Sequence, residues 1–480
     1  ARIQAIGSAA WIDEQIGTTA TGWPVLPLQP EAVPSSCTGT CVRDNYTMYL
    51  LQRHFFTKAL YSPDQLRQRV AWALYKILVV SGRDVSHPSR LSPYLTILDQ
   101  RAFGSYRALL SDITLSPAMG RYLDMASSTR TRPNENFARE ILQLFSIGTD
   151  VLNADGTPRL DAGGVPLPTY DQATVDAFTR VFTGWSFAAQ PSPGIVNYTA
   201  PLVLNAANHD TTAKTLLSGT TLPAGQTGTV DMNAALDNIF QHPNVGPFIG
   251  RQLIQSLVTS NPSPAYVARI SAVFANDGTG VRGNLGAVVK AILLDTEARA
   301  TPPAALTYGK LKEPVLYVNQ ILRAFNPRAA SGTGQSDGYL APRTTPMDQD
   351  VFRPATVFSY YPPDYLVTGA VEGPEFGILS ASTSLARANF ANTIVFSTIG
   401  TSTDAPNGTS IDLAPLQALA GNPAQLVDEA ARRLTGGSLS ATARTTIVTA
   451  VNAVAASNTL LRARTAVYLV ATSSQFQVER

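Results

Sequence analysis

Residues 132–147, which read RPNENFAREILQLFSI, are the most informative stretch of this chain for predicting its fold. The polar run Asn134–Asn136 lies near the start of this stretch, and Arg139 and Glu140 follow about one helical turn later. Apolar residues recur at helical spacing on one face, which predicts an amphipathic helix over residues 134–147. Because ionisable groups are dense at the start of an otherwise apolar helix, we expect them to face inward, toward other parts of the protein, and to form a polar site.

Helical patterns dominate the sequence on both sides of this stretch, so we predict a mainly α fold. No low-complexity linker divides the chain, and the prediction is one large helical domain over residues 1–480. Turn signals at Asp155-Gly156 and Gly163-Gly164 predict a small β-hairpin excursion over residues 150–170. Two irregular segments are predicted to be long loops, residues 189–230 and 326–350.

Composition excludes several classes of function. The net charge is only +2 and no run of Lys or Arg forms a basic stripe, so binding to nucleic acid or to an anionic membrane is not indicated. No segment approaches the roughly 18–20 apolar residues of a bilayer span, and no transmembrane segment is predicted. Charged residues make up 15% of the chain, against about 25% in ordinary proteins, which favours an exported protein over a cytosolic one.

Cys37 and Cys41 are the two cysteines, in the segment CTGTC. In an oxidising compartment they would form a small disulfide loop, which is the prediction. Two unpaired thiols are the alternative. A zinc site would need two further ligands, and no His lies within ten residues, so no metal site is predicted here.

Several blocks of sequence resemble a known family. The polar run at residues 134–140, NENFARE, followed by Phe182-Thr183-Gly184-Trp185, resembles the signature of the bacterial domain-of-unknown-function family 1800. Other blocks agree with this resemblance over almost the whole chain: residues 11–15, His209-Asp210 with Lys214, residues 352–358, residues 363–365 and residues 462–480.

This resemblance implies an exported, mainly helical protein whose first family helix would precede residue 1. It also implies a frequent genomic neighbour and possible partner, an exported protein of family 1501 that resembles the sulfatases and alkaline phosphatases. The family carries no assigned activity, so the resemblance implies no reaction.

The two carboxylates of the polar helix are candidate catalytic groups. At 3.6 residues per turn Glu135 stacks on Arg139, whereas Glu135 and Glu140 point about 140° apart. Glycoside hydrolysis needs two carboxyl groups roughly 5–10 Å apart, so Glu140 or Glu135 would need a partner such as Asp176 or Asp210. The alternative is a buried Glu–Arg network that only locks helices together.

Further residues are assigned roles around this centre. His209 and Asp210 are predicted to approach the acid from a facing loop and act with it in catalysis, although a plain loop turn explains them equally well. Substrate hydroxyls and rings are predicted to contact five residues: Asn134, Asn136, Arg139, Trp185 and Lys214.

No cofactor is predicted. Asn153, Asp155 and Asp161 resemble part of a calcium loop, but Val151 and Ala162 stand where carboxylates are needed. Calcium is therefore a minor alternative to a plain hairpin turn.

Together these features predict an exported protein that acts on or binds an extracellular polymer, and a polysaccharide fits best. If it is an enzyme, a glycosidase-like hydrolase using carboxylate acid/base chemistry is expected. The alternative is a non-enzymatic structural or assembly protein of the cell surface, whose polar helix only locks the core.

Overall fold

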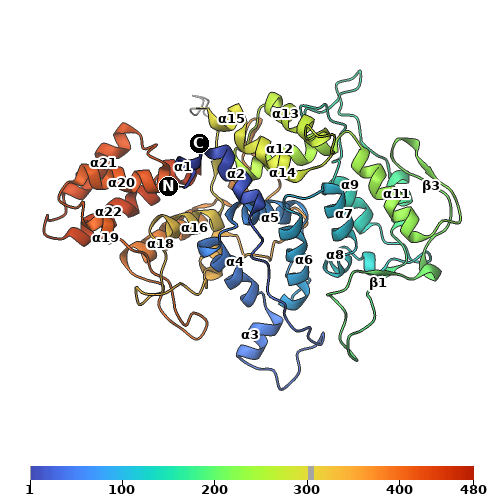
Figure 1. The fold of residues 1–480 in the computed structure, drawn as a ribbon, viewed down its shortest axis with the longest axis horizontal. Helices are drawn as coiled ribbons and strands as arrows, with labels where there is room; N and C mark the ends of the chain where they lie inside the picture. The colour runs from blue at the N-terminus through green and yellow to red at the C-terminus, as the bar shows by residue number, and fades with distance from the viewer. Residues whose placement is uncertain (1, 301–306, 480) are drawn as a thin grey trace. The chain divides into compact units, whose positions relative to one another are not determined.

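The computed structural model describes residues 2–300 and 307–479 (Figure 1). The chain is 51% helical, and the strands of the described residues form only small two-stranded sheets. This confirms the predicted mainly α fold with minor β hairpins. The chain forms two compact units. Of the described residues, 2–51, 63–300 and 355–359 form unit 1, and 52–62, 307–354 and 360–479 form unit 2.

Unit 1 holds a core of packed helices in which α5 contacts α2, α6 and α12, and α7 contacts α6 and α11. Its helices are α1 (Arg2–Ile6), α2 (Ser8–Gly17), α3 (Thr40–Tyr46), α5 (Gln65–Ile77), α6 (Pro88–Arg101), α7 (Tyr106–Thr114), α8 (Pro117–Tyr122), η1 (Met125–Ser127), α9 (Asn136–Gln143), α10 (Gln172–Val181), η2 (Ala206–Asn208), η3 (Leu217–Gly219), α11 (Gly228–Gln241), α12 (Val245–Leu257), α13 (Pro264–Ala275), α14 (Leu285–Leu294) and α15 (Thr296–Arg299). Its antiparallel strand pairs are β1 (Trp185–Ser186) with β2 (Val203–Leu204), and β3 (Lys214–Thr215) with β4 (Thr221–Leu222).

Helix α4 (Tyr49–Tyr61) runs from unit 1 into unit 2. The other helices of unit 2 are α16 (Pro314–Ala324), α17 (Ala341–Thr344), η4 (Thr345–Met347), η5 (Pro374–Ile378), α18 (Ala381–Phe396), α19 (Ala414–Gln417), α20 (Pro423–Thr435), α21 (Ala441–Asn452), α22 (Thr459–Ala471) and α23 (Ser474–Gln477). Its antiparallel pairs are β5 (Lys310–Leu311) with β8 (Val478–Glu479), and β6 (Leu366–Thr368) with β7 (Val371–Glu372). Helix α22 is central, since it contacts α18, α20 and α21.

Local side-chain bonds set many of the helix ends. Asp171 accepts a hydrogen bond from the amide of Thr174 at 2.9 Å and so caps the start of α10. At the other end of a helix, α20 stops at Gly436, which has φ +63° and follows the last turn as a left-handed residue.

Helix α9 is shorter than its predicted range of residues 134–147. Its start is displaced because the side chain of Asn134 accepts the amide of Asn136 at 2.9 Å, which holds the chain in a turn before the helix. Its end is displaced because the amides of Phe145 and Ile147 bond to carbonyls five residues back, at 3.0 Å each.

The predicted β excursion is present over residues 150–170 as isolated antiparallel bridges. These pair Asp150 with Pro168, Leu152 with Pro158, and Leu160 with Pro166. The predicted loop at residues 189–230 carries the short strands β2, β3 and β4, and the segment at 326–350 carries α17 and η4.

Candidate functional site

The exposed start of α9 carries an ion-pair network. Arg139 Nη2 donates to Glu135 Oε1 at 2.8 Å, and the side chain of Gln172 on α10 contacts both residues, at 3.1 and 3.0 Å. The hydrogen bonds from Arg139 and then Gln172 lower the pKa of Glu135. The side chains of Glu135 and Arg139 are 48% and 36% exposed. The predicted stacking of these two residues is confirmed, but the network lies at the surface and not inside.

Asn134 and Glu135 are exposed and Asn136 is half-buried, so the prediction that they face inward is wrong for the first two. The reason is that the buried stripe of α9 consists of other residues, Phe137, Ala138, Ile141 and Leu142. The helix turns its early polar side chains outward because that stripe faces the core.

Glu140 is the exception among these polar residues. It is half-buried, and within the described part of the chain its carboxylate makes no hydrogen bond or ion pair. Burial raises its pKa, and the charge of Arg139 opposes that shift only in part. Tyr122 and Tyr170 are electrostatically coupled to it. Burial, with the charges of Asp84 and Glu140, raises the pKa of Tyr122 to about 12.

The predicted His209 and Lys214 belong to a different, buried network. His209 Nδ1 lies 3.0 Å from the carbonyl oxygen of Thr183, and Nε2 lies 3.1 Å from Asp231 Oδ2. Lys214 Nζ donates to the same Asp231 oxygen at 2.7 Å and to the Asp210 carbonyl at 2.6 Å. Both partners of the imidazole, the Thr183 carbonyl and the Asp231 carboxylate, are oxygen atoms that can accept a hydrogen bond.

The side chains of His209, Lys214 and Asp231 are at most 1% exposed. The roles predicted for His209 and Lys214 require side chains open to a substrate, and their observed contacts instead join α10, β3 and α11. Trp185, predicted to stack on a substrate, is also buried, at 5% exposure.

Asp210 is engaged in a turn. Its carboxylate accepts the amide of Thr212 at 2.8 Å, and its own amide donates to Thr183 Oγ1 at 2.9 Å. Burial opposes ionisation, but the bonds from Thr212 and the charges of Lys214 and Arg180 outweigh it and lower the pKa of Asp210. Asp210 therefore lies in a plain loop turn, which is the alternative expected for it from the sequence.

Gly184 explains why Phe182-Thr183-Gly184-Trp185 stands beside this network. It has φ +89°, and a Cβ placed on it would lie 2.8 Å from the amide nitrogen of His209. Only glycine permits both that conformation and that close approach. The segment Phe182-Thr183-Gly184-Trp185 is therefore a backbone turn that lies directly against the backbone of His209.

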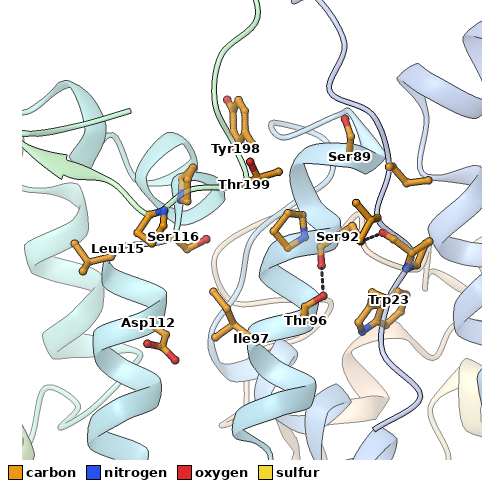
Figure 2. A pocket seen from close by; sticks show the side chains of 16 residues that line it. Trp23, Ser89, Ser92, Thr96, Ile97, Asp112, Leu115, Ser116, Tyr198 and Thr199 are labelled. Atoms are coloured by element: carbon orange, nitrogen blue, oxygen red, sulfur yellow. Dashed lines mark hydrogen bonds between the residues drawn. The ribbon is translucent and has the colours of Figure 1, made fainter. Parts of the chain in front are cut away.

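A cavity of about 480 Å³ lies elsewhere in unit 1, between α6, the end of α7, and the loops at residues 23–26 and 198–201. Figure 2 shows Ser92, Thr96 and Ile97 of α6 between Trp23 on one side and Leu115 and Ser116 on the other. The lining combines aromatic, hydroxyl and apolar residues with one carboxylate: Trp23, Pro24, Val25, Leu26, Ser89, Ser92, Pro93, Thr96, Ile97, Asp112, Leu115, Ser116, Pro117, Tyr198, Thr199 and Pro201.

Polar contacts fix this lining. Ser92 Oγ donates to the Pro24 carbonyl at 2.5 Å, which ties the 23–26 loop to α6. Asp112 pairs with Arg101 at 2.6 Å, so its charge is compensated. Arg90 lies over the Tyr198 ring, with its guanidinium carbon 4.9 Å from the ring centroid. Ser89 Oγ is buried and has no hydrogen-bond partner in the described chain, so a polar group is left for a ligand.

A family model described as protein of unknown function DUF1800 matches residues 1–478. The chain belongs to this family. Comparisons with curated proteins and with solved structures gave no match. The two blocks that resemble the family signature, residues 134–140 and 182–185, lie in the α9 surface network and in the turn beside His209, and neither block lines the cavity.

The residues that line the cavity were not predicted from the sequence to form a site. A signal for them exists. Ser89, Ser92 and Thr96 recur at intervals of three and four, which places their hydroxyl groups on one face of α6. Pro93 interrupts the same helix and cannot donate a backbone hydrogen bond to the Ser89 carbonyl.

The disulfide prediction is confirmed, since Cys37 and Cys41 are bonded. This bond indicates an environment outside the reducing cytosol. None of the described helices has the length and apolarity to cross a membrane.

The described residues contain no group of three or more His, Cys, Asp or Glu arranged to hold a metal ion. Two carboxylates of the calcium-like stretch are used by their own turns. Asp155 accepts the amide of Thr157 at 3.0 Å, and Asp161 accepts that of Gly163 at 2.8 Å.

Proposed function

We propose that this protein binds an extracellular polysaccharide, with the sugar chain seated in the cavity lined by Trp23 and Tyr198. The observation that carries the proposal is the composition of that cavity. Aromatic rings and apolar side chains supply faces for the C–H surface of a sugar ring, and the hydroxyl groups of α6 supply donors and acceptors for sugar hydroxyls. A volume of about 480 Å³ is within the roughly 300–1,000 Å³ of ligand pockets.

A neutral polysaccharide fits the charges best. Asp112 is the acidic residue of the lining. Because Arg101 compensates its negative charge, Asp112 does not favour a cationic ligand. Arg90, next to Tyr198, already forms an ion pair with Glu31 at 2.7 Å. Since both charges are compensated, an uncharged ligand with many hydroxyl groups meets no unpaired ion in this cavity.

An extracellular location supports the same proposal. The Cys37–Cys41 disulfide is the kind of bond that persists in the periplasm, at the cell surface or outside the cell. We therefore propose that the protein is exported. A family-1501 protein as partner also remains a proposal, and it rests on the family resemblance alone.

Hydrolysis at Glu140 is a second candidate function, favoured by one observation. Glu140 combines burial, a raised pKa and the lack of a partner, as a general acid requires. Asp84 would be the second carboxyl group, because it and Glu140 both act on the pKa of Tyr122. Asp176, by contrast, accepts from Gln172 at 2.8 Å within the surface network.

Binding can be tested with purified protein and a panel of soluble α-glucans, β-glucans, xylans and mannans, by affinity electrophoresis and calorimetry. Val25→Asp is the first variant, because Val25 lines the cavity yet is 96% exposed, so the change should leave folding intact. Trp23→Ala removes a ring from the lining. The matched control is Tyr365→Ala, an exposed aromatic of unit 2.

We expect wild type and Tyr365→Ala to bind one class of glycan equally, and Trp23→Ala and Val25→Asp to bind it at least about tenfold more weakly. Equal binding by all four proteins would show that the glycan does not bind in the cavity. Release of shortened glycans by wild type but not by Glu140→Gln would establish the hydrolase instead. No binding to any glycan would leave the structural or assembly protein as the better account.

A further inference from the structure

Unit 2 contains a buried cluster of charges that no function described above uses. Lys310, Lys312, Glu313, Glu375 and Arg387 are each at most 3% exposed. They meet where β5 leads into α16 and where η5 and α18 pack beside it. Three cations face two anions, so the buried part of the cluster carries one net positive charge. Glu479, at 33% exposure, lies 3.8 Å from Lys312 at its edge.

Most of these charges have partners. Lys310 Nζ lies 3.0 Å from Glu375 Oε1. Glu313 Oε2 accepts from Gln349 Nε2 at 2.7 Å and from the Tyr361 hydroxyl at 3.0 Å. Lys312 Nζ donates to the Phe476 carbonyl.

Arg387 is the exception. It is 1% exposed, and its Nε, Nη1 and Nη2 atoms donate to no acceptor within the described residues. Its guanidinium carbon lies 5.4 Å from the centroid of the Tyr317 ring, a contact that satisfies none of its five N–H groups. Glu375 complements it, because its Oε2 atom is buried and accepts a hydrogen bond from no donor among the described residues. A buried donor group and a buried acceptor atom in one cluster suit a ligand that can both accept and donate hydrogen bonds.

We propose that Arg387 and Glu375 form a binding site for a small oxyanion that still carries a proton, such as hydrogen phosphate or bicarbonate. The oxygens of such an ion accept from the guanidinium fork, for which oxyanions are the matching partners. Its remaining O–H donates to Glu375 Oε2. The ion's charge is opposite to the net charge of the buried cluster. An oxyanion without a proton, such as sulfate, would set a negative oxygen against Glu375.

Thermal unfolding and calorimetry of the whole protein test this site near pH 7, with phosphate, bicarbonate, sulfate or chloride at equal ionic strength. An ion that binds only the folded state raises the melting temperature in proportion to the logarithm of its concentration. We expect phosphate or bicarbonate to raise it by several degrees at 100 mM, and sulfate and chloride to have no such effect. A response to phosphate alone or to bicarbonate alone identifies the ion, whereas equal responses to phosphate and sulfate overturn the proposal.

Three variants make the test specific. Arg387→Met removes the guanidinium and should abolish the response. Glu375→Gln offers an N–H in place of the acceptor and should allow sulfate to bind. Arg462→Met is the matched control, because Arg462 is also buried in unit 2 but bonds to the carbonyls of Val454 and Ala420 at 3.0 and 2.9 Å.

The control should retain the wild-type response to phosphate or bicarbonate. If a variant does not fold, the wild-type comparison of phosphate with sulfate still decides. Absence of any ion-specific stabilisation in wild type would mean that water alone fills the site, and the proposal fails.

Discussion

At the scale of single residues, Glu140 differs from the other acidic residue of α9. Glu135 is exposed and paired with Arg139, whereas Glu140 is half-buried and its carboxylate has no partner among the described residues. Helical spacing predicted which side chains stack, because it depends only on 3.6 residues per turn. The same spacing marked the apolar face of α9, which is the face that is buried, so Asn134 and Glu135, which lie off that face, were wrongly expected to face inward.

Glu140→Gln should stabilise the protein by up to about 1 kcal/mol at pH 7.5. Burial raises the pKa of Glu140 in the folded state above the ordinary value that it has in the unfolded chain. At pH values between these two pKa values the folded protein binds more protons than the unfolded chain, so the free energy of unfolding falls as the pH rises through this range. Glutamine removes the cost of a buried charge. Urea unfolding at pH 7.5 and pH 4 measures the effect, which should vanish at pH 4. A variant less stable than wild type at pH 7.5 would show that the carboxylate has a bound partner.

Gly184→Ala should destabilise the protein by about 2–4 kcal/mol. The new Cβ would meet the His209 backbone at 2.8 Å in a residue with φ +89°, so both strain and overlap oppose it. The control is Gly194→Ala, where φ is +77° but no atom lies within 4 Å, and where only about 1 kcal/mol of backbone strain is expected. Urea midpoints of the two variants give the comparison. Equal losses would mean that Gly184 is needed for its backbone angle alone.

At the scale of secondary-structure elements, the sequence predicts that helices exist better than where they end. The apolar stripe of α9 was visible in the periodicity. Its ends were not, because Asn134 bonds the Asn136 amide and the amides of Phe145 and Ile147 bond to carbonyls five residues back. Such bonds depend on local geometry that apolar spacing does not encode.

The network between α10, β3 and α11 shows the same limit. His209 and Lys214 were recognised because they stand in a block that resembles the family. Asp231 was not, since an acidic residue in the first turn of a helix is usually a solvated favourable charge on the helix dipole. Its burial follows from the packing of α11 on α10, which only the folded chain brings about.

Asp231→Asn should destabilise the protein by about 3–5 kcal/mol, because it removes the buried carboxylate that lies 2.7 Å from the ammonium group of the buried Lys214. The matched control lies on the same helix. Asp237→Asn removes an ion pair between Asp237 and Arg107. Because the Asp237 side chain is 64% exposed, this change should lower the free energy of unfolding by less than about 1 kcal/mol. Urea unfolding at pH 7 measures both. Similar values for the two variants would show that the buried network adds no stability of its own.

At the scale of the whole molecule, composition and periodicity were enough for the mainly α class, and the blocks of signature sequence were enough for the family. The cavity was not predicted, because the residues around it come from positions 23–26, 89–97, 112–117 and 198–201 and meet only after folding. Nor was the cluster around Arg387 predicted, since a lone arginine on a helix reads as a surface residue. Sites assembled from distant segments leave no periodic trace in the sequence.

Acid sensitivity is a property of the whole fold that the structure predicts. His87 is 3% exposed at the start of α6, with its ring 4.7 Å from that of Tyr46. Burial, and then the charge of Arg90, lower its pKa to about 4 from an ordinary value near 6.5. The unfolded chain therefore binds more protons between pH 6.5 and 4, so the stability that neutral His87 contributes is present above pH 6.5 and is lost as pH falls through this window.

We expect wild type to lose about 2–3 kcal/mol more than His87→Gln between pH 6.5 and pH 4, since glutamine does not titrate. Urea unfolding at half-unit pH steps gives both curves. Burial also lowers the pKa of His242, so some loss should remain in the variant and His242→Gln should reduce it further. If His87 stays neutral in the folded protein, the curves of unfolding free energy against pH for wild type and His87→Gln must diverge as the pH falls. Parallel curves would show that the protons are taken up by another group.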